Sequence, residues 1–292
     1  MSTENKELIA RLDALLNLLG RHLEPGIEAP DWLASVAFQY RKSGRNGRLV
    51  PVRSVSEITA DALQEIEAQK EKILANTSRF LKGLPANNVL LTGARGTGKS
   101  SLVKACLNAY SNQGLRLIEM DKSDLIDLPE VVDLVAERPE RFIVFCDDLS
   151  FDDGDSAYKA LKSVLDGSVS QTSANVLIYA TSNRRHLLPE YMSENRDYTH
   201  TPDGEVHPSE GVEEKISLSE RFGLWLSFYP FNQDEYLAVV RQWLSAFDVD
   251  SAHIEAARAE ALVWALERGS RSGRVAYQFA CDFVGRYRLS NT

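Results

Sequence analysis

Residues 87–101 read Asn-Asn-Val-Leu-Leu-Thr-Gly-Ala-Arg-Gly-Thr-Gly-Lys-Ser-Ser, and the fold of the whole chain can be worked out from this stretch. Its apolar run, Val89 to Leu91, is typical of a short strand buried in a parallel sheet. The residues from Gly93 to Ser100 match the pattern G-x-x-x-x-G-K-[ST]. In that pattern the backbone N–H groups of a glycine-rich loop surround a phosphate, and the following helix points its positive end at the same anion.

The loop therefore predicts a site for a nucleoside triphosphate. Lys99 is placed to reach the outer phosphates, and the Ser100 hydroxyl to ligate the accompanying Mg²⁺. A chance glycine-rich turn is the alternative, but a strand precedes the loop and a helical run follows it, which argues against chance. The residues expected to hold the nucleotide are Gly93, Ala94, Arg95, Gly96, Thr97, Gly98, Lys99, Ser100 and Ser101.

Composition indicates a globular protein of the cytoplasm. The chain has 292 residues, 43% hydrophobic and 26% charged, enough for one large domain or two smaller ones. No apolar run approaches the roughly 20 residues that cross a bilayer, and no signal-peptide pattern is present. The three cysteines lack metal-ligand spacing, which favours buried thiols. A net charge of −9 disfavours nucleic-acid binding over the whole surface but permits a local basic patch.

Residues 1–54 are interpreted as an N-terminal helical and irregular extension. Apolar residues between positions 8 and 23 recur at helical spacing, so this segment either packs on the body or docks a partner. Residues 26–51 are expected to be irregular, with Trp32, Phe38 and Tyr40 as anchors. The basic turn at residues 41–48 is interpreted as a solvated loop, with a nucleic-acid or phosphate contact as the alternative.

Acidic residues follow the apolar strand at residues 141–146. Asp147 and Asp148 come at its carboxyl end, which is the edge where open α/β sheets bind ligands. Asp147 is placed to hold Mg²⁺ through water, opposite Ser100. Asp148 is the candidate general base for the attacking water. The alternative is a pair of acids that simply begins a loop.

A second strand with a polar tip spans residues 176–181 and is followed by Asn183. If this strand is a neighbour of the phosphate-loop strand, Asn183 can orient the attacking water or contact the terminal phosphate. A helix N-cap or turn residue is the alternative. The acids at positions 152, 153 and 155 fit a solvated turn and helix cap better than a second metal site, and the five histidines have no partners at metal-ligand spacing.

Other elements complete an α/β pattern up to residue 230. A helix is expected over residues 59–82, a strand over 115–120, a helix over 128–137 and a final strand over 224–229. Residues 190–215 are a long polar insertion of the kind that is often functional. After Pro230 the pattern changes to three helices, over residues 234–247, 252–268 and 273–288. The expected domains are therefore 1–54, 55–230 and 231–292.

This order of motifs resembles the AAA+ ATPases over residues 55–290. The resemblance implies a P-loop NTPase fold: a three-layer α/β sandwich with a five-stranded parallel sheet and a C-terminal all-α lid. More narrowly, the chain is similar to a bacterial AAA+ family of uncharacterised ATP-binding proteins. The stretches that carry this match are residues 85–91, 145–151, 179–187 and 272–274.

The resemblance also implies roles for residues at matching positions. Lys99 and Ser100 would bind phosphate and Mg²⁺, Asp147 would hold the metal, and Asn183 would be the first sensor of the terminal phosphate. ATP or ADP is the implied nucleotide, since the Asn-Lys-x-Asp run that selects guanine is absent.

Two arginine roles follow from the same resemblance. Arg221 resembles the arginine finger that one subunit inserts into its neighbour's active site, which implies self-association. Arg274 resembles the second sensor, in the lid, with Arg271 as the reserve candidate. An ordinary surface salt bridge is the alternative for Arg221. Asp148 stands where the family has glutamate, which affects the expected rate of hydrolysis more than nucleotide binding.

The leading hypothesis is an oligomeric ATPase that remodels or loads a macromolecular partner, with a protein as the expected partner. The second is a nucleotide-dependent binding switch or adaptor that hydrolyses slowly. A DNA-linked role like that of helicase loaders is a third; it is motivated by the basic turn at residues 41–48 and by Arg184 and Arg185, but no DNA-binding module supports it.

Overall fold

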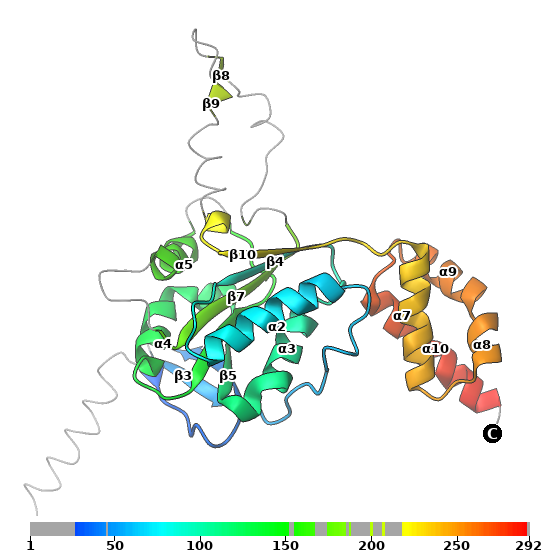
Figure 1. The fold of residues 1–292 in the computed structure, drawn as a ribbon, viewed down its shortest axis with the longest axis horizontal. Helices are drawn as coiled ribbons and strands as arrows, with labels where there is room; N and C mark the ends of the chain where they lie inside the picture. Colours follow the sequence, from blue (N-terminus) through cyan, green and yellow to red (C-terminus); the bar gives the residue numbers. More distant parts are fainter. Residues whose placement is uncertain are drawn as a thin grey trace, which may run out of the picture.

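The structure is a computed structural model that describes residues 27–44, 46–151, 155–166, 174–184, 187, 199–200, 206–207 and 218–290. Figure 1 shows an α/β body at one end of the molecule and a group of helices at the other. The expected N-terminal helix, Asp152, Asp153 and nearly all of the 190–215 insertion lie outside the described residues. No helix in the described ranges has the length and hydropathy needed to cross a membrane.

The described part of the body is built on a sheet with the strand order β1-β3-β2-β5-β6-β7-β4-β10. The five strands expected from the sequence pair in parallel with one another. Because β4 lies between β7 and β10, the loop after β4 meets the carboxyl ends of both neighbours. The five strands are β4 (Val89–Gly93), β5 (Leu115–Glu119), β6 (Arg141–Cys146), β7 (Val176–Ser182) and β10 (Leu224–Phe228).

The expectation that residues 26–51 are irregular is wrong. They form β1 (Ile27–Glu28), β2 (Ala37–Ser43) and β3 (Asn46–Pro51), and β2 pairs antiparallel with β3 and parallel with β5. The reason is the alternation of Phe38 and Tyr40, which are both buried in the core together with Leu49 of β3. Gly47 makes room for this packing, because a Cβ there would lie 2.2 Å from the Tyr40 hydroxyl.

Helices cover both faces of the sheet and complete three layers. Buried side chains of α2 (Glu67–Leu81) and α3 (Lys99–Tyr110) join one core cluster. Those of α4 (Leu128–Val135) and α5 (Ser156–Asp166) join another on the opposite face. Two 3₁₀ turns, η1 (Ser111–Gln113) and η2 (Lys122–Asp127), flank β5, and the short strands β8 (Thr199–His200) and β9 (Val206–His207) pair antiparallel.

The expected helix over residues 59–82 is shorter than predicted. It begins at Glu67, and residues 55–66, here called the strap, form turns and irregular backbone instead. Side chains distant in sequence hold the strap by its carbonyl groups: Asn108 donates to Ser56 O (2.6 Å) and Ile58 O (2.7 Å). These bonds replace the hydrogen bonds of a helix, which explains why local pattern alone misplaced its start.

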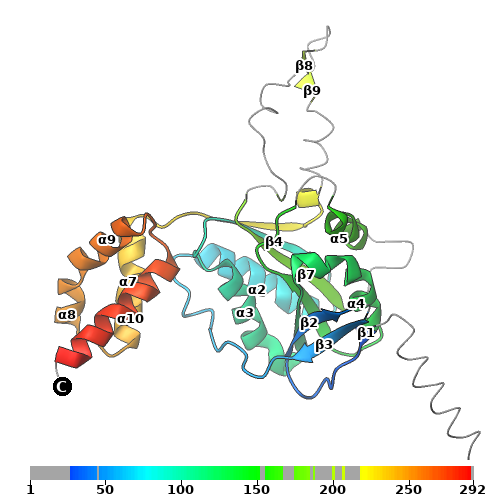
Figure 2. The ribbon, with the colours of Figure 1, turned by 180° about the vertical axis from the view of Figure 1, so that it is seen from behind.

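Four helices follow the body, namely α7 (Gln233–Ala246), α8 (Ser251–Ala256), α9 (Arg258–Glu267) and α10 (Gly273–Ser290), and they are called the lid. Their buried side chains form a core of their own. Figure 2 shows these helices from behind. The helix expected over residues 252–268 is divided at Ala257, which is buried in that core between two differently directed helices. The domain boundaries expected from the sequence stay predictions.

Candidate nucleotide-binding site

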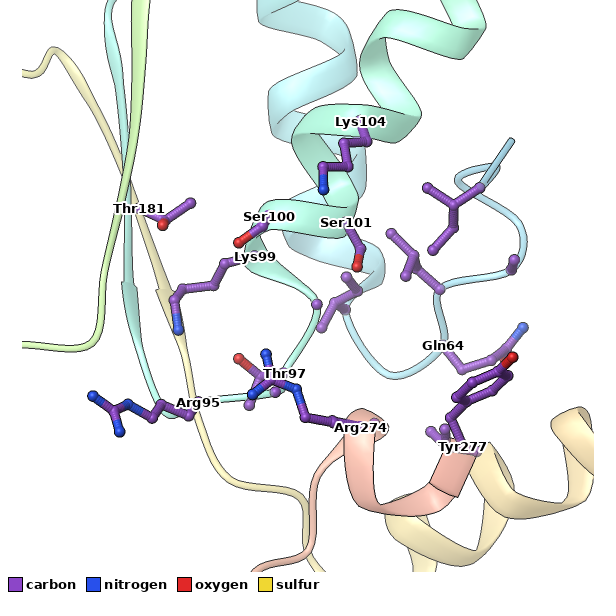
Figure 3. Close-up of a pocket in the computed structure, with 18 of the residues that line it drawn as sticks. Gln64, Arg95, Thr97, Lys99, Ser100, Ser101, Lys104, Thr181, Arg274 and Tyr277 are labelled. Atoms are coloured by element: carbon purple, nitrogen blue, oxygen red, sulfur yellow. The ribbon is translucent and has the colours of Figure 1, made fainter. Parts of the chain in front are cut away.

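A cavity of about 1060 Å³ lies where the phosphate loop, residues 93–100, meets the strap and the lid. Figure 3 shows its lining side chains converging from these three parts of the chain. The phosphate-loop side is polar and carries Lys99, Ser100 and the acids that follow β6. The strap and the lid supply most of the apolar lining, with Ile58, Leu63, Ile66, Val239, Trp243 and Tyr277.

Glycines give the phosphate loop its shape. Gly93 has φ +126°, and a Cβ there would lie 1.8 Å from the carbonyl oxygen of Phe228, so β10 packs directly against the start of the loop. Gly98 has φ +98° and caps the first turn of α3. Thr97 closes the loop by donating from its hydroxyl to Ala94 O at 2.8 Å. The loop therefore presents its concave backbone to the cavity at the N-terminus of α3.

Lys99 is buried at the base of this loop, with only 6% of its surface exposed. Its Nζ donates to Gly93 O (2.8 Å), Ala94 O (2.7 Å) and Asn183 Oδ1 (3.0 Å). Burial lowers the pKa of the Lys99 ammonium, and the carboxylate of Asp148 acts against this shift. All three ammonium hydrogens are thus committed to neighbouring oxygens.

Asp147 lies beside Ser100, as the sequence predicts. The Ser100 hydroxyl donates to Asp147 Oδ1 at 2.6 Å, which joins the start of α3 to the end of β6. Thr181 of β7 donates to the same carboxylate oxygen at 2.6 Å, and its hydroxyl accepts the N–H of Asp148 at 2.9 Å. Thr181 is the functional candidate that the sequence analysis missed, although it stands only two residues before Asn183.

Asp148 is held in a backbone conformation that few residues other than glycine adopt. Its φ is +51°, and its carboxylate accepts a hydrogen bond from the side-chain amide of Asn183. Asn183 therefore bridges Lys99 and Asp148 across the carboxyl ends of β6 and β7. The structure brings both sequence-predicted residues to the same corner of the cavity.

The donor set fits Mg²⁺. The Ser100 hydroxyl and Asp147 carboxylate are hard oxygen donors in mutual contact, and Mg²⁺ is commonly bound by one or two protein oxygens together with water and phosphate. No group of three or more His, Cys, Asp or Glu side chains suited to a metal occurs in the described residues. Asp155, the described member of the three nearby acids, accepts from Ala157 N at 3.0 Å and so caps α5.

The lid arginines occupy different places. Arg274 lines the main cavity, and its backbone N–H donates to Gly96 O at 3.3 Å. Arg271 instead lines a second cavity, of about 340 Å³, behind the phosphate loop. Arg221 lines neither of these two cavities and forms an ion pair with Asp166 at the end of α5. Of the two lid arginines, only Arg274 lines the main cavity. Arg221 lies on the surface of the body.

The chain is similar to known proteins in sequence and in fold. A family model described as "protein of unknown function (DUF815)" matches residues 33–287. No curated protein matches the sequence. Similar solved structures include the FIGL-1 AAA domain in complex with ADP, with 18% identity and a TM-score of 0.51 over 80% of this chain and 76% of that one.

Two further structures are similar at low identity. The HORMA:CdnC:Trip13 complex of E. coli MS115-1 contains a chain with 11% identity and a TM-score of 0.50, covering 76% of this chain and 89% of that one. The Thermotoga maritima RuvB Holliday junction branch migration motor has 16% identity and a TM-score of 0.47 over 76% of this chain. This chain spans 63% of the RuvB chain. The similarities to the FIGL-1 and Trip13 structures, with TM-scores of 0.51 and 0.50, show the fold alone.

Proposed function

Because this chain belongs to the DUF815 family and has the fold of the AAA+ ATPases, we propose that it is a cytoplasmic ATPase that binds ATP at subunit interfaces and uses hydrolysis to remodel or load a macromolecular partner. One observation carries the proposal. A continuous hydrogen-bonded chain runs along the edge of the cavity through six residues, in the order Lys99, Asn183, Asp148, Thr181, Asp147 and Ser100. An adaptor that only binds Mg²⁺-nucleotide needs the phosphate loop, Ser100 and Asp147, but has no use for Asp148 and Asn183 paired beside them.

Each side chain has a definite task in this proposal. Lys99 and the loop N–H groups bind the phosphates, and Ser100 with Asp147 hold Mg²⁺, which neutralises phosphate charge when bound. Asp148 accepts the proton of the attacking water at its carboxylate, and Asn183 orients that water or the terminal phosphate. The hydrogen bond between Asn183 and Asp148 supports this pairing of roles.

The apolar end of the cavity suits a nucleobase. Trp243 and Tyr277 of the lid lie edge to face with ring centroids 4.8 Å apart, and Ile58 and Leu63 of the strap line the same cavity. A base placed there would bury its faces against aromatic and aliphatic carbons, as in most small-molecule sites. The absence of a guanine-selecting run supports adenine.

The arginines support a shared site. Arg274 reaches the cavity from the lid and is proposed as the residue that senses the terminal phosphate, in preference to Arg271. Arg221 lies outside its own chain's cavity, so it can complete a site only on a neighbouring subunit. This arrangement supports self-association through the surface around Arg221.

The test is ATP turnover as a function of protein concentration, with mass measured in parallel, for the native chain and Arg221→Ala. Specific activity should rise as an oligomer forms, and Arg221→Ala should bind ATP but lose about 10³-fold or more in turnover. Arg48→Ala, which removes an exposed arginine of the β2–β3 hairpin, is the matched control. A monomer with flat, concentration-independent turnover would refute the shared site.

The second candidate is a slow nucleotide-dependent switch that docks a partner in one nucleotide state. It is favoured by Asp148, whose short side chain and positive φ limit its reach toward a water molecule. Turnover below about one per minute, with and without candidate partners, would select the switch, since typical enzymes reach on the order of 10 s⁻¹.

A further inference from the structure

Two exposed arginines line the nucleotide cavity, namely Arg95 of the phosphate loop and Arg274 of the lid. Neither forms an ion pair within the described part of the chain. Elsewhere in the described residues, several cations do form ion pairs, such as Lys42 with Asp127 at 2.7 Å and Arg138 with Glu140 at 2.9 Å. In a chain of net charge −9, unpaired guanidinium groups beside a phosphate loop indicate an anionic ligand.

The groups that usually meet phosphate are already engaged. Lys99 uses all three ammonium hydrogens on Gly93 O, Ala94 O and Asn183 Oδ1, and the Ser100 hydroxyl donates to Asp147. A nucleotide entering this site therefore has to displace internal hydrogen bonds to reach them. Arg95 offers five N–H donors that require no such displacement.

Arg95 is close enough to act on the centre of the site. It lines the nucleotide cavity together with Lys99 and Arg274. Figure 3 shows Lys99 and Arg274 reaching toward the phosphate loop from α3 and from the lid, while the Arg95 side chain extends from the loop on the side away from Arg274. Because Arg95 belongs to the loop expected to cradle the phosphates, its side chain is anchored beside them.

We propose that the Arg95 side chain binds the terminal phosphate of the nucleotide held in its own loop, as a cation supplied in cis. This proposal rests on the proposed function and adds a catalytic residue to it, because the sequence pattern gives that loop position only a backbone role. A guanidinium fork on the terminal phosphate stabilises the charge that develops during transfer. The site then depends on Arg221 of a neighbour for only part of its transition-state charge.

Arg271 provides the matched control. It is also an exposed arginine near the loop, and with Arg95 it lines the second cavity, but it does not line the nucleotide cavity. If Arg95 served only that second cavity, then Arg95→Ala and Arg271→Ala would have the same effects. If Arg95 binds the terminal phosphate, Arg95→Ala should weaken binding of the triphosphate but not of the diphosphate, and Arg271→Ala should weaken neither.

The experiment is calorimetric titration of the full chain with Mg²⁺-ADP and with a non-hydrolysable Mg²⁺-ATP analogue. Arg95→Ala should weaken binding of the triphosphate about 10- to 100-fold and leave ADP affinity within about twofold. Arg95→Lys should fall between, since it keeps the charge and loses the fork. Arg271→Ala should bind both ligands like the native chain, and thermal melting should show all variants folded.

Equal losses for ADP and the triphosphate in Arg95→Ala would overturn the inference, as would parallel behaviour of Arg95→Ala and Arg271→Ala. A native chain that binds neither nucleotide would refute the proposed function itself and this inference with it. If the native chain and Arg95→Ala bind ADP and the triphosphate with equal affinities, the proposed nucleotide site is supported. Arg95 is then not part of that site.

Discussion

Thr181→Val removes one hydroxyl that organises both acids of the site. Thr181 is 1% exposed, donates to Asp147 Oδ1 at 2.6 Å and accepts the Asp148 N–H at 2.9 Å. Valine has nearly the same shape and suits a strand, so the substitution tests the hydroxyl rather than the packing. Asp147 and Asp148 should lose their alignment while β7 stays in place.

The size of the effect follows from the two bonds. A hydrogen bond to a charged group contributes about 1.5–3 kcal/mol. The Asp148 N–H keeps a second acceptor, Asp147 Oδ1 at 3.2 Å, so loss of the Thr181 hydroxyl does not leave it without a partner. Both acids are exposed, so water replaces part of each loss. We therefore expect the free energy of unfolding to fall by about 2 kcal/mol and turnover to fall about 10-fold or more, as for residues that orient metal ligands.

Urea unfolding and turnover against Mg²⁺ concentration measure the two effects. Thr181→Ser should keep both hydrogen bonds and stay close to native. Thr77 of α2 carries a buried hydroxyl that is hydrogen-bonded to Tyr179 of β7. Thr77→Val should therefore lose stability without a change in Mg²⁺ dependence. The reasoning is refuted if Thr181→Val and Thr181→Ser have the same Mg²⁺ dependence.

Three further predictions address the loop, the lid and pH. Gly93→Ala places a Cβ 1.8 Å from a carbonyl oxygen of β10, so it should cost more than about 3 kcal/mol in urea unfolding and abolish nucleotide binding. Gln242→Leu removes the 2.9 Å bond from the lid to a strap carbonyl and should speed ADP release about 2- to 10-fold in stopped-flow; unchanged release would disprove this tether. The backbone N–H and side chain of His253 lower the pKa of Asp250 to about 2. The ionised Asp250 carboxylate stabilises the fold above its unfolded pKa of 3.8, and this stabilisation is lost as the pH falls toward 2. The melting temperatures of the native chain and Asp250→Ala should therefore converge over that interval. A constant difference between them would contradict this prediction.

Much of the fold follows from short-range pattern. The phosphate loop and the strand ahead of Asp147 are apolar runs with defined ends, and parallel pairing brings their tips together. The β2–β3 hairpin was missed because charged residues and glycines dominate its turn, although Phe38, Tyr40 and Leu49 carry the alternation of buried strands. The alternation that predicts strands was present, but the charged residues and glycines of the turn favoured a loop more strongly.

The rest of the site depends on contacts that local sequence does not encode. The strap leaves the helical path because Asn108, Lys70 and Gln242 bind its carbonyl groups from three different helices. Thr181 gained its role from strand order, which places β7 beside β6. Arg221 resembles a finger in sequence, while its pairing with Asp166 depends on how α5 packs.

The hairpin also decides where this protein can be shortened. A protein that begins at residue 55, the boundary suggested by the sequence, would lose β2 and leave β5 as a bare outer strand with open N–H and C=O groups. It would also uncover the core surface on which Phe38 and Tyr40 pack. We expect such a fragment to aggregate through edge-to-edge pairing of β5 between copies. A fragment that begins near residue 27 keeps β2 paired with β5 and should stay in solution.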